Sequence, residues 1–134
     1  PDTLVTMADG TTKLISEIKV GEHVLDGGEV YSVIQSKAPD EIYHYAGSVF
    51  VTAQHAVCEG GVWSRVCDAS LAVKCAAEIS TVWNLATHKH RIVINGITFA
   101  DFHETDDFLA LTSAGSIAAL NGEYVEEECS TQTL

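Results

Sequence analysis

Short apolar or alternating segments recur along this chain, and turn signals separate them at a spacing of roughly 8 to 12 residues. The clearest turn signals are Asp9-Gly10 and Asn95-Gly96, dipeptides that favour two-residue hairpins. Residues 29–36 read as one strand whose side chains alternate between two faces. Segments this short and this frequent are typical of antiparallel strands, and they argue against strands that alternate with helices. The pattern therefore predicts an all-β protein.

The predicted secondary structure follows from these segments. The expected strands cover residues 4–7, 12–14, 23–25, 29–36, 42–46, 48–51, 62–67, 79–85, 91–94 and 97–100. Residues 15–18 fit a single helical turn, and the alanine-rich residues 68–77 fit either a short helix or a loop that carries a strand. In the last part of the chain, Asn121-Gly122 follows the apolar residues 117–120 and is a second hairpin signal.

Chain length and composition favour a single core. The 134 residues are 46% hydrophobic, which is enough for one domain. The composition changes near Asp101, because residues 102–107 form a polar and acidic joint. We therefore expect a domain over residues 1–101 and an extension over residues 102–134. The extension either packs on the domain or continues into another one.

The charge of the chain excludes some classes of partner. Nineteen acidic residues stand against seven basic ones, and the net charge is −12. Such a surface repels phosphate backbones, so we expect no nucleic-acid partner and interpret the charge as a source of solubility. No apolar run approaches the length of a membrane span, so we expect no membrane partner either.

The cysteines give no sign of a metal site. Cys58, Cys67, Cys75 and Cys129 form no CxxC pair, whereas closed zinc sites usually show paired short spacings. We read them as reduced structural thiols, with a disulfide as the alternative. We expect no metal and no cofactor, and the cysteines leave the cellular compartment undecided.

Two stretches about thirty residues apart carry the residues suited to chemistry. Thr52-Ala53-Gln54-His55 sets a hydroxyl and an imidazole together on a turn within an apolar run, and His90 opens a second apolar run. The pKa of an imidazole lies near the working pH, so histidine suits proton transfer. Taken alone, Thr52 and His55 are better explained by a threonine that caps a turn and a histidine that is partly buried in the core.

In order, and together with the opening Asp2-Thr3-Leu4-Val5, these stretches resemble the Hint domains shared by hedgehog C-terminal domains, inteins and bacterial intein-like domains. The resemblance covers residues 1 to about 101. It implies the Hint fold, a compact disk of many short antiparallel strands with a pseudo-two-fold arrangement. It also implies that the domain acts on its own backbone, so that its partner is its own upstream polypeptide.

In the family, a cysteine or serine at the start of the domain attacks the preceding carbonyl and turns the amide into a thioester or ester. The resemblance places Thr52 where the family's threonine orients the peptide, and His55 where its histidine faces the scissile nitrogen. His90 matches the histidine of the later motif, and we expect its neighbour His88 to face solvent. Asn84 stands where that motif has an aspartate, and an amide cannot accept a proton as a carboxylate does.

The C-terminal motif departs from that of a splicing intein, which ends in His-Asn followed by cysteine, serine or threonine. This chain has Ala100, Asp101 and Phe102 at those three places. The helper histidine and the nucleophile are missing, and a carboxylate cyclises poorly, so we do not expect splicing. The pattern is closer to bacterial intein-like, viral or hedgehog-type domains that cleave at the N-terminal side. The family's nucleophile would lie three residues before Pro1, so this chain alone cannot start the reaction.

The candidate catalytic residues are Thr52, His55, Asn84, His90 and Asp101. The first hypothesis is a self-processing domain of a larger precursor that cleaves its N-terminal junction. The alternative is an inactive Hint fold kept as a structural module, for example in a viral or phage particle, with assembly partners bound through residues 102–134. A third hypothesis is an unrelated β-barrel binding module. The first hypothesis predicts that Thr52, His55 and His90 share one cleft, which the chain enters at Pro1.

Overall fold

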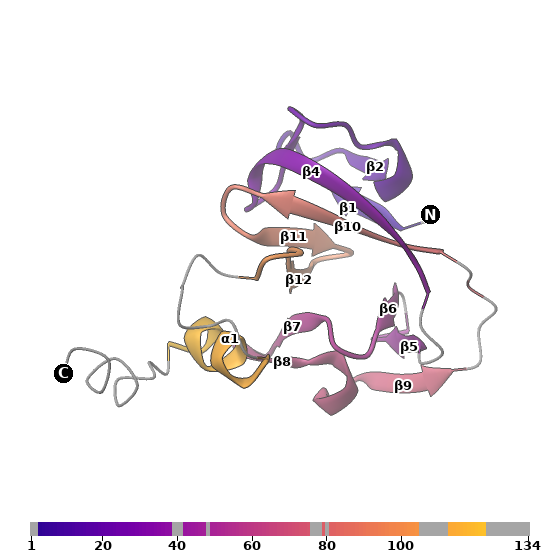
Figure 1. Ribbon diagram of the computed structural model, residues 1–134, viewed down its shortest axis with the longest axis vertical. Coiled ribbons are helices and arrows are strands. Elements are labelled where there is room, and N and C mark those ends of the chain that lie inside the picture. Colours follow the sequence, from indigo (N-terminus) through magenta and orange to yellow (C-terminus); the bar gives the residue numbers. More distant parts are fainter. Residues whose placement is uncertain are drawn as a thin grey trace.

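The computed structural model describes residues 3–38, 42–47, 49–75, 79, 81–104 and 113–122. It consists mainly of short strands, as predicted (Figure 1). Along the chain the elements are β1 (Leu4–Thr6), β2 (Thr12–Leu14), the 3-10 turn η1 (Ile15–Glu17), β3 (His23–Val24), β4 (Gly28–Lys37), β5 (Ile42–Tyr45), β6 (Val49–Thr52), β7 (Ala56–Glu59), β8 (Val62–Arg65), the 3-10 turn η2 (Val66–Asp68), β9 (Ala72–Cys75), β10 (Thr81–Thr87), β11 (Arg91–Ile94), β12 (Ile97–Ala100) and the helix α1 (Ser113–Leu120). Among the described residues, no helix combines the length and the apolar character needed to cross a membrane.

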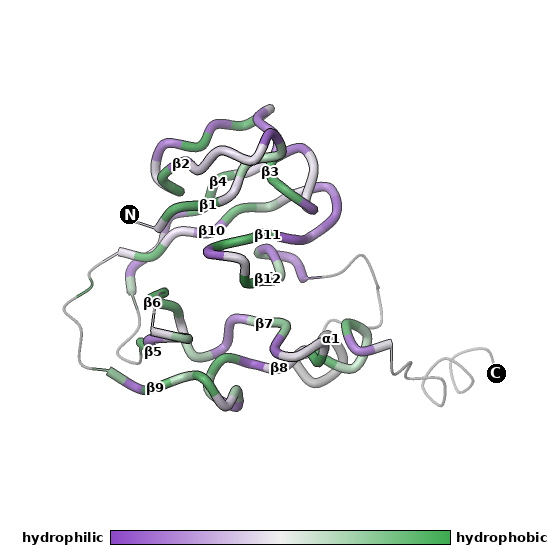
Figure 2. The backbone as a smooth tube through the Cα atoms, turned by 180° about the vertical axis from the view of Figure 1, so that it is seen from behind, coloured by the Kyte–Doolittle hydropathy of each residue, from purple (hydrophilic) through white to green (hydrophobic). Residues whose placement is uncertain are grey.

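The strands pair antiparallel in small sheets. Their orders are β1-β2, β10-β4-β3, β11-β12-β7-β8 and β6-β5-β9. Figures 1 and 2 show the same arrangement from opposite sides. Strands β1 to β4 and β10 form one group, and β5 to β9 lie with α1 in another. Strands β11 and β12 lie between the two groups, so this hairpin links both halves of the fold.

The hairpin of β11 and β12 forms where its turn signal predicted it. Ile94 pairs with Ile97, and the turn residues Asn95 and Gly96 have φ angles of 50° and 76°. A type I′ turn needs positive φ at both central positions, and asparagine followed by glycine meets this need at least cost. This turn fixes the register that brings Arg91 opposite Ala100 at the far end of the hairpin.

The core draws on residues from most of the strands. Its largest fully buried side chains are Tyr45, Phe99, Leu85, Ile92, Val5, Val24, Val30, Val57, Val66 and Thr87. They come from both groups of strands, and Figure 2 shows hydrophobic and hydrophilic stretches following one another along the chain. Of the ambiguous residues 68–77, the described residues 68–75 form a loop that carries a strand, since η2 is followed by β9. Strand β9 pairs with β5 and so extends the β6-β5-β9 sheet.

The prediction of a hairpin at Asn121-Gly122 was wrong. Residues 117–120 belong to α1, and the helix ends at this dipeptide instead. Gly122 has φ 74°, and its N–H donates to the Ala119 carbonyl at 3.0 Å. Asparagine and glycine that tolerate positive φ serve helix ends as well as hairpins, so the dipeptide alone does not distinguish the two.

Helix α1 lies against the sheet that contains the hairpin. Ile117 and Leu120 pack on a small cluster of buried residues that includes Trp63 of β8 and Ala100 of β12. The Asn121 side chain accepts from the Trp63 N–H at 2.6 Å and donates to the Trp63 carbonyl at 2.9 Å. Residues 113–122 of the extension therefore pack on the strands. Residues 105–112 and 123–134 lie outside the described part of the chain.

Candidate functional site

The T-x-x-H motif forms a tight turn between two strands. Thr52 ends β6 and His55 lies directly before β7, and the His55 N–H donates to the Thr52 carbonyl at 3.2 Å. On either side, Val51 and Ala56 are buried, so the apolar run around the motif holds both strands in the core. The turn thereby places the hydroxyl of Thr52 and the imidazole of His55 on the same wall of a cavity.

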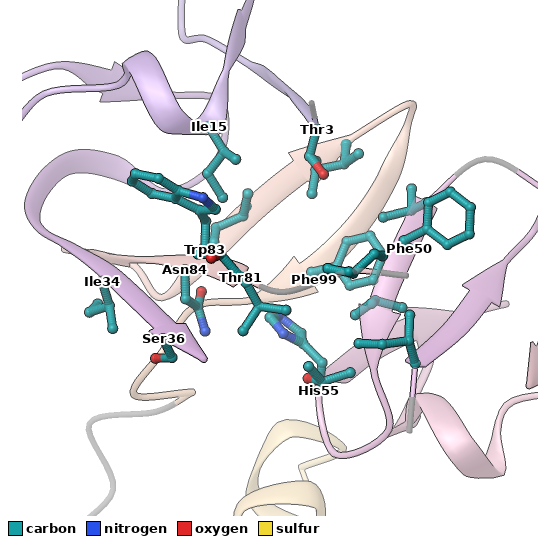
Figure 3. Close-up of a pocket in the computed structure, with 18 of the residues that line it drawn as sticks. Thr3, Ile15, Ile34, Ser36, Phe50, His55, Thr81, Trp83, Asn84 and Phe99 are labelled. Atoms are coloured by element: carbon teal, nitrogen blue, oxygen red, sulfur yellow. The ribbon is translucent and has the colours of Figure 1, made fainter. Parts of the chain in front are cut away.

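This cavity has a volume of about 700 Å³, and apolar side chains from both groups of strands form most of its wall. Figure 3 shows His55 pointing into it, with Asn84, Thr81 and Phe99 nearby. Its polar wall residues are Thr3, Ser36, Thr52, His55, Thr81, Asn84 and Asn95. Two further wall residues, Phe50 and Phe102, are about half exposed, so the cavity opens to solvent.

The imidazole of His55 is held by a backbone carbonyl. Its Nε2 lies 2.8 Å from the Ala100 oxygen, and the Phe99 ring packs against it at 5.5 Å between ring centroids. A carbonyl oxygen only accepts, so Nε2 carries the hydrogen and Nδ1 has the lone pair. Removal from water lowers the pKa of His55, although the Ala100 carbonyl offsets part of this effect. The imidazole is therefore neutral at neutral pH.

Asn84 of β10 lies on the cavity wall together with Thr52 and His55. Its side-chain oxygen accepts from the Leu85 N–H at 2.8 Å. This bond fixes the orientation of the amide and leaves the side-chain nitrogen as a hydrogen-bond donor. Asn84 thus brings a neutral hydrogen-bond donor to a position where a carboxylate would bring negative charge.

His90 lies elsewhere. It is buried, it is not a wall residue of the cavity, and its Nδ1 lies 2.9 Å from Oδ2 of Asp101. The reason is local, because His90 closes the turn after β10 with φ 59° and this turns its ring toward Asp101. The expectation of one shared cleft thus fits Thr52 and His55 but not His90. Its neighbour His88 is exposed, as expected.

The described part of the chain begins at Thr3. Pro1 lies outside the described residues, so its predicted entry into the cleft stays a prediction. Thr3, two residues further on, is a wall residue of the cavity, and its carbonyl accepts from the Ile15 N–H at 2.8 Å.

Asp101 is fully buried and serves as an acceptor for four donors. Its Oδ2 accepts from the Thr87 N–H at 2.7 Å and from His90, and its Oδ1 accepts from the N–H groups of His103 and Glu104 at 3.0 and 2.9 Å. An ionised carboxylate, which only accepts, satisfies all four contacts at once. The residue at the place of the family's cyclising asparagine is therefore built into the fold around it.

Sequence reasoning missed an ion pair beside the motif. The Arg65 guanidinium donates to the Gln54 carbonyl at 2.9 Å and forms a salt bridge with Glu104. It thus ties the T-x-x-H turn to the segment that follows Asp101. No sequence signal marks this pair, because the two residues lie in different parts of the chain and neither belongs to a motif.

The described residues contain no cluster of three or more histidine, cysteine or acidic side chains that could hold a metal ion. Cys58, Cys67 and Cys75 are free thiols, and Cys129 lies outside the described residues. The carboxylates and imidazoles of the site are instead bonded to each other and to the backbone.

Comparison with known proteins identifies the fold. No protein-family profile and no curated protein sequence matches the chain. Among solved structures, the DnaB intein from Synechocystis sp. PCC 6803 matches with 16% identity and a TM-score of 0.55, over 75% of this chain and 94% of that one. The gp41-1 intein matches with 18% identity and the same TM-score and coverage. The chain therefore has the all-β Hint-type fold that its ordered motifs predicted.

Proposed function

We propose that this chain is a self-processing domain that cleaves the peptide bond at its N-terminal junction by an acyl shift. One observation carries the proposal: Thr3, Thr52 and His55 line a single cavity, so the entering chain and the T-x-x-H motif meet there. The solved structures that share the fold are inteins, which agrees with an activity on the chain's own backbone.

The nucleophile of this reaction is a cysteine or serine three residues before Pro1 in the precursor. Its thiol or hydroxyl attacks the preceding carbonyl carbon, so a C–S or C–O bond forms as the C–N bond breaks. Nδ1 of the neutral His55 takes the proton of the nucleophile and delivers it to the leaving amine nitrogen. The proton is conserved over the step. A depressed pKa suits this task because the resting imidazole is then free to accept a proton.

Thr52 and Asn84 contribute hydrogen bonds to the reacting peptide. The hydroxyl and the side-chain amide both lie on the cavity wall, and each has a donor to offer. Donors aimed at the carbonyl oxygen stabilise the negative charge that develops when the nucleophile attacks. A neutral Asn84 does this without the repulsion that a carboxylate would exert on the oxyanion.

The C-terminal junction stays intact in this proposal. The Asp101 carboxylate accepts four hydrogen bonds, and cyclisation would require it to leave all of them. Ala100 has no group that transfers a proton, and Phe102 has no nucleophile. The activity is therefore cleavage at the N-terminal side, without splicing.

The same fold without activity is the second candidate. It is favoured by the amide at Asn84, which binds the Leu85 N–H, and by the structural use of Asp101. In that case the domain is a structural module, and residues 102–134 are its contact with assembly partners.

A fusion protein distinguishes the two candidates. It carries a reporter, then Cys and two residues, then the full chain from Pro1, and it is incubated with and without a small thiol. Release of the reporter only with thiol, and only when Cys is present rather than Ala, supports the acyl shift, because a thiol intercepts a thioester. A folded fusion protein that releases no reporter supports the inactive module.

A further inference from the structure

One peptide group connects the two histidines that the motifs supply. The carbonyl of Ala100 accepts from Nε2 of His55 at 2.8 Å. The N–H of the same peptide group, which belongs to Asp101, donates to the His90 carbonyl at 3.1 Å. A peptide group is planar and rigid, so its two hydrogen bonds cannot adjust independently. The direction of the Ala100 carbonyl is therefore tied to the position of the His90 backbone.

The side chain of Asp101 closes this arrangement. Its Oδ2 binds the ring of His90 and the Thr87 N–H, which lie at opposite ends of the turn after β10. Its Oδ1 accepts from the N–H groups of His103 and Glu104, which follow two and three residues later in the chain. The Ala100 carbonyl cannot swing away from His55 unless several of these bonds break, and those to the carboxylate are stronger than bonds between neutral groups.

The other groups around His55 do not offer the same contact. Arg65 on β8 is a cation with donors only, and it binds the Gln54 carbonyl and Glu104. Phe99 presents a ring nearly perpendicular to that of His55. Among the charged groups, Arg65, Glu104 and Asp101 act on the imidazole through space, but none of them receives its hydrogen bond.

We infer that Asp101 is a positioning residue, whose carboxylate holds the Ala100 carbonyl against His55 and thereby keeps the hydrogen of the imidazole on Nε2. The inference rests on the proposed function for its catalytic meaning, since Nδ1 is then the atom that exchanges protons with the reacting peptide. A junction residue that a splicing domain uses for cyclisation serves here to orient the histidine of the first step.

The tautomer matters because it decides which nitrogen has the lone pair. With the hydrogen on Nδ1, the side of the ring that should accept the nucleophile's proton would carry a donor. In a serine protease, the loss of tautomer control by an aspartate lowers kcat by about 10⁴. Asp101 acts through a peptide group rather than directly, so we expect a smaller effect, on the order of tenfold to a hundredfold.

The first experiment is nitrogen NMR on the 134-residue chain, which needs no nucleophile and no cleavage. The two neutral tautomers of His55 give distinct ¹⁵N shifts for Nδ1 and Nε2. We expect the Nε2–H form alone in the wild type, a mixture in Asp101→Asn, and the wild-type signals in the exposed matched control Asp68→Asn. An Nδ1–H form in the wild type, or an unchanged Nε2–H form in a folded Asp101→Asn, overturns the inference.

The second experiment compares two variants of His90 and remains decisive if Asp101→Asn does not fold. In asparagine, Nδ2 lies at the position of the histidine Nδ1, so His90→Asn can still donate to Asp101, and asparagine tolerates the positive φ. His90→Ala has no donor. In the cysteine-bearing fusion protein, we expect His90→Asn to retain reporter release within about threefold and His90→Ala to lose about tenfold or more.

The pH profile separates positioning from a general loss of structure. In His90→Ala, His55 should show a mixture of tautomers, and the pH at which reporter release is half-maximal should move. In His90→Asn, the His55 tautomer and this pH should match those of the wild type. Equal rates and profiles in the two variants overturn the inference. If the wild-type fusion protein releases no reporter but the tautomer responds as expected, the proposed function fails and the positioning role of Asp101 stands.

Discussion

His55 and His90, the two histidines of the motifs, each donate a ring hydrogen to an oxygen, but their environments are very different. His55 gives its ring hydrogen to a neutral backbone carbonyl and faces a cavity of about 700 Å³. His90 gives its ring hydrogen to a buried carboxylate and is not a wall residue of that cavity. A histidine held by a carbonyl keeps one nitrogen for chemistry beside open space. A histidine paired with a buried carboxylate contributes to the structure, so the partner and the adjoining space distinguish their roles better than burial does.

The largest expected difference concerns stability. His90→Ala leaves the buried Asp101 carboxylate with three of its four donors, and a lost hydrogen bond to a charged group typically costs about 1.5 to 3 kcal/mol. His55→Ala removes one hydrogen bond to a carbonyl and should cost about 1 kcal/mol beyond its packing. Urea denaturation of the 134-residue chain measures both free energies of unfolding. Equal losses for the two variants would show that His90 and His55 do not differ as described.

The second difference concerns the rate of reporter release from the cysteine-bearing fusion protein. His55→Ala removes the group that transfers the proton and should slow release by roughly 10² or more. His90→Asn, which keeps its donor to Asp101, should remain close to the wild type. Release is followed by gel electrophoresis after addition of thiol. Equal release from wild type and His55→Ala would exclude a catalytic part for His55.

A third difference appears in the pH dependence of stability. Burial holds the pKa of His55 below its ordinary value of about 6.5, so in the folded chain its proton binds only at lower pH. Below about pH 6.5 the unfolded chain takes up a proton on this histidine that the folded chain does not, and the free energy of unfolding falls as pH falls. Above it, this contribution is fully present. Urea denaturation from about pH 5 to 8 should show that the free energy of unfolding depends less steeply on pH in His55→Ala than in the wild type. Parallel curves would contradict the pKa shift.

The smallest expected effect is the absence of cleavage at the second junction. The bond between Asp101 and Phe102 should stay intact under conditions in which the N-terminal junction reacts, because the Asp101 carboxylate is held by four donors. Mass spectrometry of the incubated fusion protein measures this. A fragment ending at Asp101, together with ligated flanking segments, would mean that the domain splices and that both junctions are active.

The sequence predicted the fold better than it predicted the site. Turn dipeptides such as Asn95-Gly96 specify a backbone conformation, so the hairpin could be located from two residues. The T-x-x-H motif likewise specified its own geometry, since Thr52 and His55 lie on one short turn. What could not be predicted depends on contacts across the fold. The hydrogen-bond partner of His55 is a backbone carbonyl, and since every residue has one, the sequence does not indicate which carbonyl it is.

His90 and Asp101 illustrate a second limit. Both were singled out by their match to motifs, but the direction of the His90 ring depends on a positive φ in the turn after β10, a conformation that residues other than glycine uncommonly adopt. The hydrogen bonds to Asp101 come largely from backbone N–H groups, which likewise leave no mark in the sequence. The motif identified the positions, and the structure was needed to see that they face each other.

The contact between Asn121 and Trp63 has a consequence for solubility. A side-chain amide offers a donor and an acceptor side by side, and here it binds both backbone groups of Trp63, as a neighbouring strand would. Strand β8 is the last one in its sheet as described, and an open sheet edge invites a second chain to pair with it. One asparagine directly after a short helix thus protects the edge from self-association. Asn121→Leu should form dimers or larger species as concentration rises, which analytical ultracentrifugation would detect.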